Sequence, residues 1–223
     1  MAQRISTSRP APGKQQLSRE FIAQHQRARI VTALAEEVAA KGYRAVTVAD
    51  IVRRAGIARN TFYDNFSSKE DCFLAAQQYG AEALAERIRE ASAEVEGWPQ
   101  RVEAGMMACL RSLAGSPALA RLCIVDALSA GPAATERYEQ SLQAFVPFFR
   151  VGRQVSAHGR KLPDTLEEAV VGGVFWIVYQ RIVAGETEQL EEIGPQLLEF
   201  VMTPYLGPEA ARRMANGEAE LDD

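Results

Sequence analysis

The side chains best suited to specific recognition lie between residues 47 and 70. Arg59, Asn60, Thr61 and Tyr63 place a guanidinium, an amide, a hydroxyl and a phenol close together in the chain. Such groups hydrogen-bond to base edges in the major groove, where Arg pairs with guanine and Asn with adenine. The residue types therefore favour recognition of nucleic acid over the making or breaking of covalent bonds.

Two short helices at a fixed angle must position these side chains. Thr47 is expected to cap the first helix, with Asp50 completing a capping box, and Gly56 is expected to take a positive φ that turns the chain into the second helix. Thr47 and Lys69 flank the motif at helix N-termini, where a hydroxyl or an ammonium can meet a phosphate. The apolar residues suited to lock the two helices together are Val48, Ile51, Val52, Ala55, Ile57, Phe62 and Phe66.

The order and spacing of these residues resemble the TetR family of bacterial one-component repressors. The shared pattern is Thr47, Ala55-Gly56-Ile57, Thr61-Phe62-Tyr63, Phe66 and Ser68-Lys69-Glu70. The resemblance implies contacts with double-stranded operator DNA at Thr47, Arg59, Asn60, Thr61, Tyr63 and Lys69. Two departures bear on these contacts. Ala58 stands where the family usually has a capping Ser or Thr, and Asp64 is expected to point away from DNA because phosphate repels its charge.

The rest of the chain also favours helices, because no segment sustains a period-two alternation. We expect an all-α protein of about nine helices, with a three-helix helix-turn-helix head and a larger helical body. Residues 1–17 are interpreted as a disordered basic arm, 18–66 as the DNA-binding domain, 67–207 as the effector-binding and dimerisation domain, and 208–223 as an acidic tail. The longer helices are expected at 18–41, 67–96, 98–114, 117–128, 133–154 with a kink at Pro147, 164–184 and 186–203.

A homodimer is expected from both the resemblance and the geometry of DNA. The resemblance implies that the last two helices of the body form a four-helix dimer interface, and an apolar stripe of Val170, Val174, Ile177 and Val178 suits that face. Gly172 and Gly173 would permit close helix approach. Two heads about 34–36 Å apart reach successive major grooves, so the expected operator is palindromic.

The resemblance further implies an effector pocket inside the body. The residues proposed to line it are Met106, Met107, Leu110, Leu122, Phe145, Phe149, Trp176 and Tyr179, although such a set also suits an ordinary core. Few charged residues interrupt these helices, which favours a small, mainly apolar or aromatic ligand. The expected function is a repressor released by this ligand. The alternatives are an activator of the same family and a helical small-molecule-binding protein without a DNA function.

Charge is distributed unevenly along the chain. The net charge is −4, but residues 1–70 hold twelve Lys and Arg against six Asp and Glu, whereas residues 71–223 hold thirteen against twenty-three. A basic N-terminal third on an acidic body is typical of a protein in which only that third touches phosphate. A chance excess of arginine is the plainer explanation when the charges are considered alone.

The sequence offers little to an enzyme or a metal site. It lacks the GxSxG, GxGxxG, P-loop and HExxH motifs, and its two histidines, His25 and His158, suit structural or surface roles. Cys72, Cys109 and Cys123 are far apart and are interpreted as small apolar residues, with redox sensing as the alternative. We expect no enzymatic activity, no cofactor and no metal.

Two further patterns concern location. No apolar run reaches the roughly 18–20 residues of a membrane span. The N-terminal segment lacks the apolar core of a secretory signal. We therefore expect a cytoplasmic protein without a membrane partner.

Overall fold

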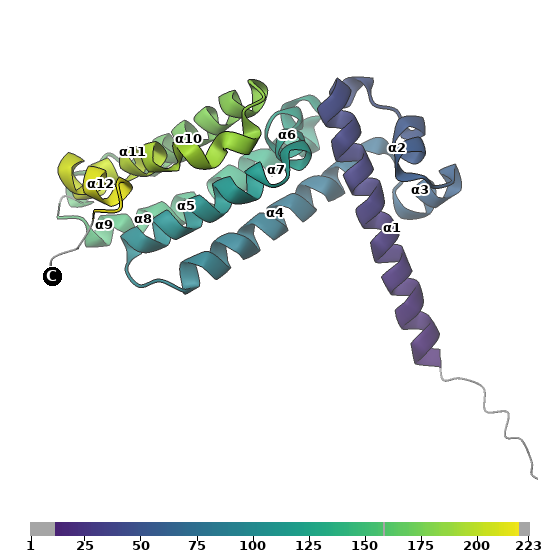
Figure 1. The fold of residues 1–223 in the computed structure, drawn as a ribbon, viewed down its shortest axis with the longest axis horizontal. Helices are drawn as coiled ribbons and strands as arrows, with labels where there is room; N and C mark the ends of the chain where they lie inside the picture. Colours follow the sequence, from purple (N-terminus) through teal and green to yellow (C-terminus); the bar gives the residue numbers. More distant parts are fainter. Residues whose placement is uncertain (1–11, 158, 219–223) are drawn as a thin grey trace, which may run out of the picture.

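The computed structural model describes residues 12–157 and 159–218, and every regular element in this part of the chain is a helix. The predicted all-α class is therefore confirmed. Figure 1 shows a head at one end of an elongated body, with α1 running past α2 and α3. The head contains α1 (Pro12–Lys41), α2 (Val48–Ala55) and α3 (Arg59–Asn65). The body contains α4 (Lys69–Ala93), α5 (Trp98–Ala114), α6 (Pro117–Ile124), α7 (Pro132–Gln143), α8 (Val146–Arg150), α9 (Gly152–Val155), α10 (Leu166–Val183), α11 (Gly194–Leu206) and α12 (Pro208–Ala215).

Short 3-10 helices connect several of these elements. They are η1 (Tyr43–Ala45), η2 (Asp126–Ser129), η3 (Gly159–Lys161) and η4 (Thr187–Ile193). The first two connect the head with the body, because η1 of the head lies against η2 of the body.

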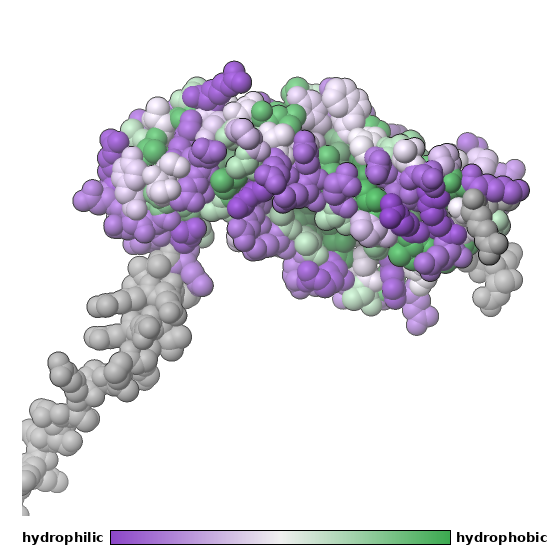
Figure 2. Space-filling model, turned by 180° about the vertical axis from the view of Figure 1, so that it is seen from behind, coloured by the Kyte–Doolittle hydropathy of each residue, from purple (hydrophilic) through white to green (hydrophobic). Residues whose placement is uncertain are grey.

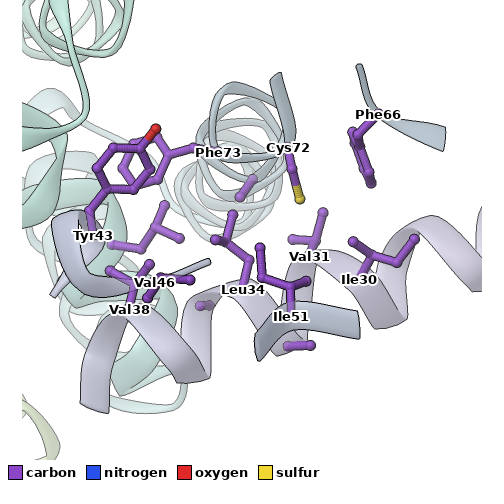
Figure 3. Close-up of a cluster of buried hydrophobic side chains, with 14 of the residues drawn as sticks. Ile30, Val31, Leu34, Val38, Tyr43, Val46, Ile51, Phe66, Cys72 and Phe73 are labelled. Atoms are coloured by element: carbon purple, nitrogen blue, oxygen red, sulfur yellow. The ribbon is translucent and has the colours of Figure 1, made fainter. Parts of the chain in front are cut away.

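One hydrophobic core spans the joint between head and body. Ile30, Leu34 and Val38, the predicted stripe of α1, are fully buried in it. Figure 3 shows side chains of α1, α2 and α4 meeting in this cluster. Leu122 of α6 and Ala134 of α7 belong to the same cluster. The head is therefore packed onto the body rather than tethered to it, and α4 and α6 lie at the connection.

Two further clusters fill the body. One joins α5, α8, α10, α11 and α12 at the end far from the head, and the other joins α5, α6, α10, η4 and α11 closer to it. A buried ion pair fastens the far end: Arg153 Nε donates to Glu167 Oε1 at 2.7 Å, and the Glu167 carboxylate is almost fully buried. Arg153 also donates to the Leu162 carbonyl oxygen, so it holds the segment before α10 in place.

Both ends of the described chain are more helical than expected. α1 begins at Pro12, so residues 12–17 are helical rather than part of a disordered arm, and proline suits a first turn that needs no N–H. Residues 1–11 of the predicted arm lie outside the described residues. Residues 208–215, predicted as tail, form α12 because Ala211 and Met214 give that helix a buried face. The tail residues 219–223 also lie outside the described residues.

Three helices of the body are divided where one was expected at each place, and the segment 117–128 is split into α6 and η2. The segment 133–154 is split into α7, α8 and α9, and Pro147 stands in the first turn of α8 rather than at a kink within a continuous helix. The segment 186–203 is split into η4 and α11, with Pro195 in the first turn of α11. Proline lacks the N–H that a continuing helix would need, which accounts for the breaks before α8 and before α11. No helix in the described ranges has the length and apolar composition required to cross a membrane.

Candidate nucleic-acid interface and body cavity

The turn between α2 and α3 is built from local contacts that the sequence predicts. The Asp50 backbone N–H donates to Thr47 Oγ1 at 3.3 Å, and the Thr47 backbone N–H donates to Asp50 Oδ2 at 2.9 Å. The predicted capping box is therefore confirmed. Gly56 follows α2 with φ +61°, and its N–H donates to the Arg53 carbonyl oxygen, which confirms the predicted turn. These contacts fix the angle at which α3 leaves α2.

α3 presents a polar face from a buried anchor. Phe62 is fully buried and its ring meets that of Tyr63 edge-on, with ring centres 5.4 Å apart, whereas Arg59, Asn60 and Tyr63 are exposed. The Arg59 guanidinium lies 5.7 Å from the centre of the Tyr63 ring, and its Nη2 lies 3.4 Å from the Tyr63 hydroxyl oxygen. The structure thus brings these three predicted contact residues together on the exposed face of α3. Thr61 lies half-buried beside them.

Two further residues of the α3 region, Ala58 and Asp64, were expected to affect DNA contacts. Ala58 is the N-cap of α3 and provides no side-chain hydrogen bond, as its side chain predicts. Asp64 is exposed. The next helix, α4, is capped by Ser68, which accepts a hydrogen bond from the Asp71 N–H. The Asp71 carboxylate in turn accepts a hydrogen bond from the Ser67 N–H.

Two arginines of α1 that the sequence did not single out hold the motif in place. Arg27 Nη1 donates to the carbonyl oxygen of Asn65, the last residue of α3, at 2.6 Å, and its guanidinium lies 4.3 Å from the Phe66 ring centre. Arg29 Nη2 donates to the carbonyl oxygen of Ala55, the last residue of α2, also at 2.6 Å. A cation at a helix C-terminus can donate hydrogen bonds to the last carbonyl oxygens, which lack partners within the helix. Its charge also interacts favourably with the helix dipole. The C-termini of α2 and α3 are therefore both capped by arginine side chains from α1.

The ammonium group of Lys69 is hydrogen-bonded within the protein and is not a free surface cation. Its Nζ donates to the carbonyl oxygens of Tyr43 and Val46 at 2.9 and 2.8 Å, and it lies 4.1 Å from the Tyr43 ring centre. Partial burial lowers the pKa of this ammonium. Lys69 therefore fastens the start of α4 to the loop before α2, while the phosphate contact stays a prediction.

Charges on α2 are largely neutralised within the head. Asp50 pairs with Lys41 at 2.7 Å and with Arg53 at 2.7 Å, and Arg54 Nε pairs with Glu37 at 2.6 Å. These pairs hold the pKa of the Asp50 carboxyl far below its usual range, with Lys41 as the largest cause and Thr47 next. Arg59, by contrast, forms no ion pair within the described residues. Its guanidinium is therefore not neutralised by a carboxylate of the described part of the head.

The body contains a half-open cavity of about 1560 Å³ between α4, α5, α6, α7, α8, α10 and α11. That exceeds the roughly 300–1,000 Å³ typical of sites for drug-sized ligands. Figure 2 shows apolar surface recessed between polar side chains along the body. Of the residues predicted to line a pocket, Met106, Phe145 and Phe149 line this cavity.

The other five predicted pocket residues lie elsewhere. Leu122 and Leu110 are buried in two hydrophobic clusters, and Met107 packs against Gly194. Trp176 is 61% exposed and stacks on Tyr179, with ring centres 5.7 Å apart. Helical spacing shows which residues share a helix face, but not whether a partner helix or an open space covers that face, and this accounts for the difference between the predicted set and the cavity lining.

Several lining residues were not predicted. Tyr138 and Phe175 form an aromatic wall with ring centres 6.5 Å apart, and Arg137 of α7 adds a guanidinium. Cys109 and Cys123 also line the cavity, and burial raises the pKa of each thiol to about 12. Both thiols therefore stay protonated at neutral pH, which agrees with their interpretation as small apolar residues.

The apolar stripe predicted for a dimer interface points inward. Val170 and Val178 are buried in the two clusters of the body, and Val174 and Ile177 pack against those clusters. The exposed apolar side chains are instead Trp176, at 61% exposure, and Val183 of α10, together with Phe200 of α11. Gly172 lies on the same side of α10 and has open space where a Cβ would stand. The predicted stripe of α10 is therefore packed within the body of one chain, and the dimer interface on α10 and α11 stays a prediction.

Comparison with known proteins agrees with this geometry. Residues 30–76 match a family described as bacterial regulatory proteins, tetR family. Over 107 residues, 48% of each chain, the sequence is 30% identical to the HTH-type transcriptional activator FasR of Mycolicibacterium smegmatis. The matched stretch thus spans about half the length of that relative.

The fold is also similar to solved structures. One is the fatty acid degradation regulator FadR from Bacillus halodurans, with a TM-score of 0.71, 16% identity, and coverage of 87% of this chain and 97% of that one. Another is the transcriptional regulator FadR from Bacillus subtilis in complex with stearoyl-CoA, with a TM-score of 0.63, 15% identity, and coverage of 81% and 98%.

Proposed function

We propose that this chain, which belongs to the tetR family of bacterial regulatory proteins, is a ligand-responsive transcriptional regulator that binds operator DNA through α2 and α3. The observation that carries the proposal is the exposed face of α3, from which Arg59, Asn60 and Tyr63 project beside one another. A short helix that carries a guanidinium and an amide near its N-terminus fits the major groove.

We assign different parts in binding to the contact residues of the head. Arg59 and Asn60 would read base edges, because each can form two hydrogen bonds to one base. Thr47, Thr61 and Tyr63 would bind the sugar-phosphate backbone and set the register. Lys69 would act on phosphate through its charge and through the loop that it holds.

The operator-bound form is proposed to be a two-fold dimer on a palindromic site. Trp176 and Phe200 leave apolar surface exposed on α10 and α11, and Gly172 leaves room for a second helix to approach. A contiguous apolar patch on a soluble protein supports an interface. In the dimer, α10 and α11 of two copies would bury this patch and separate the two α3 helices by about one turn of DNA.

The proposed effector is an amphiphile with a long apolar chain and an acidic or thioester head, such as an acyl-CoA. The cavity is large and mostly lined by apolar side chains, including Val102, Met106 and Phe145. Arginine side chains from α4 and α7, such as Arg87 and Arg137, supply positive charge on the same lining. The relative from Bacillus subtilis was solved with stearoyl-CoA, which supports this ligand class.

Repression released by the effector is the proposed mode of regulation. A dimer bound across a promoter blocks access to it, and a coupling of about 1–3 kcal/mol changes DNA affinity about 5- to 150-fold. Activation is the second candidate, because the relative FasR is described as a transcriptional activator. A promoter-reporter assay in cells with and without the protein separates the two modes.

The test of the proposal is a titration of the full chain onto duplex DNA from the region upstream of its own gene. A shuffled duplex of equal length is the control. Preference for the upstream duplex, with affinity that falls steeply as salt is added, is the expected result. Equal binding to both duplexes would refute specific recognition. Stearoyl-CoA and stearate are then added to separate tubes to test the effector class.

A further inference from the structure

Two side chains join α7 to the first turns of α4 in opposite directions. Arg137 of α7 donates from Nη1 to the carbonyl oxygen of Leu74 on α4 at 2.8 Å. Gln77 of α4 donates from Nε2 to the carbonyl oxygen of Ala134 on α7 at 3.2 Å. Both bonds reach across two helices to main-chain acceptors. We call this pair of contacts the α4–α7 clamp.

Both clamp side chains also line the body cavity. Gln77 is only 6% exposed, and its Oε1 is buried without a hydrogen-bond partner. Arg137 has no carboxylate within ion-pair distance among the described residues. A buried acceptor without a donor is costly in a protein interior, and the Arg137 guanidinium is only half-buried. Each is therefore available to a polar ligand group that enters the cavity.

The clamp acts on the part of α4 that is packed against the head. Cys72 and Phe73, immediately before Leu74, are fully buried in the core that joins head and body. Ala134, the acceptor on α7, belongs to the same core. Lys69, at the start of α4, binds two carbonyl oxygens of the loop that precedes α2. Any displacement of these turns of α4 is therefore transmitted to the DNA-binding motif.

The distal part of α4 buries fewer of its side chains than its first turns do. The buried residues of α4 are Cys72, Phe73, Ala76 and Gln77, all within its first third. The remainder of the helix has exposed or half-buried side chains, many of which line the cavity. The clamp thus lies at the boundary between the buried first turns of α4 and the part whose side chains are exposed or half-buried.

We infer that the α4–α7 clamp is the element that the effector opens. A carboxylate or carbonyl oxygen of the ligand accepts hydrogen bonds from Arg137 in place of the Leu74 carbonyl. An N–H or O–H group of the ligand, where it has one, donates to Gln77 Oε1. The inference rests on the proposed function, because it specifies how an amphiphile in that cavity changes DNA affinity. A free fatty acid and an acyl-CoA both carry the oxygen acceptor.

The experiment compares Arg137→Met with Arg101→Met in the full chain. Arg101 is a matched control, since it also lines the cavity and donates to a main-chain oxygen, that of Val95, but beyond the far end of α4. DNA affinity is measured without ligand and with saturating stearoyl-CoA or stearate. The wild-type ratio of the two affinities is expected within about 5- to 150-fold.

Arg137→Met is expected to bring this ratio close to one, because the clamp is already open. Its DNA affinity without ligand should match that of the liganded wild type. Arg101→Met should keep the wild-type ratio at saturation. A wild-type ratio in folded Arg137→Met protein would overturn the inference. A response to stearoyl-CoA but not to stearate shows that the CoA portion is required, and the reverse shows that the free carboxylate is required.

A second measurement keeps the clamp testable if the proposed effector class or the DNA site is wrong. In the ligand-free protein, hydrogen exchange of the amides of residues 72–80 should be faster in Arg137→Met than in Arg101→Met. If Arg137→Met does not fold, Gln77→Met takes its place in the experiment and should show the same increase in exchange. Unchanged exchange in both clamp variants would overturn the inference that these two bonds hold α4 in place. A wild type that responds to neither amphiphile would instead refute the proposed effector while leaving the exchange result in force.

Discussion

The backbone N–H of Tyr43 donates a hydrogen bond of 3.0 Å to Oδ1 of Asp126, and this bond joins the DNA-binding head to the body. Tyr43 lies in η1 just before α2, and Asp126 lies at the start of η2 just after α6. Both residues are buried. The other carboxylate oxygen of Asp126 has no hydrogen-bond partner and lies 3.6 Å from Arg121 Nε. Burial raises the pKa of this carboxyl, although the Tyr43 N–H and Arg121 act in the opposite direction.

Removing this acceptor should destabilise the joint. Asp126→Ala leaves the Tyr43 N–H buried without a partner, which is expected to cost about 1–3 kcal/mol in the free energy of unfolding. Asp126→Asn keeps an acceptor oxygen and should lose less. Urea denaturation followed by circular dichroism measures both variants. Equal stability of Asp126→Ala and the wild type would show that this bond contributes nothing to the joint.

The capping box of α2 should make the head sensitive to acid. Lys41 and Thr47 hold the pKa of the Asp50 carboxyl below that of the unfolded chain, which is about 3.9. A lowered folded pKa stabilises the protein above the unfolded value, and this contribution is lost as the pH falls below about 4. The melting temperature of Asp50→Asn should therefore depend less on pH between 6 and 3 than that of the wild type. Asp64→Asn, on the exposed side of α3, is the control and should follow the wild-type curve.

Substitutions on α3 should separate sequence reading from backbone binding. Arg59→Ala and Asn60→Ala are each expected to cost about 1–3 kcal/mol on the specific duplex and little on shuffled DNA. Tyr63→Ala should weaken binding to both duplexes to a similar degree. Fluorescence anisotropy with the two duplexes measures this difference. Equal losses on both duplexes for all three variants would contradict the proposed division of roles.

Lys69 should matter for stability as well as for DNA. Lys69→Met removes the donor to the Tyr43 and Val46 carbonyl oxygens and should lower the melting temperature in the absence of DNA. It should also weaken binding to specific and shuffled duplexes alike, because a charge near phosphate is lost. A variant with wild-type melting and reduced DNA affinity would show that Lys69 acts on phosphate alone.

The exposed apolar face of α10 and α11 should control the oligomeric state. Trp176→Glu and Phe200→Glu each place a charge in the proposed interface and should yield monomers in light scattering after size exclusion. The monomers should bind the palindromic duplex at least about tenfold more weakly, because only one half-site is held at a time. Leu128→Glu is the control, since Leu128 is 56% exposed on η2, away from that face. Dimers of unchanged stability in both interface variants would place the interface elsewhere.

The head could be predicted in detail because its features depend on residues close together in the chain. Thr47 bonds to Asp50 three positions away, and the turn at Gly56 needs only the absence of a Cβ. The bonds from Arg27 to Asn65 and from Arg29 to Ala55 span 38 and 26 positions. No local pattern signals such contacts, so the arginines of α1 were missed.

The body was less predictable because its central helix is apolar on every side. Residues 169–179 of α10 hold no charged side chain, so helical periodicity cannot say which face meets the core. Val170 and Val178 were assigned to the surface and are buried, whereas Trp176 was assigned to the pocket and is exposed. Packing of α10 against α5 and α11 decides its orientation, and that information lies far away in the sequence.

The most direct test of the account is the affinity of the full chain for its upstream duplex and for a shuffled duplex, measured across a salt series with and without stearoyl-CoA. Specific binding should weaken steeply with salt and change about 5- to 150-fold at saturating ligand, while Arg59→Ala should lose the preference for the upstream sequence. Equal affinity for the two duplexes at every salt concentration would contradict the central claim that α3 reads DNA.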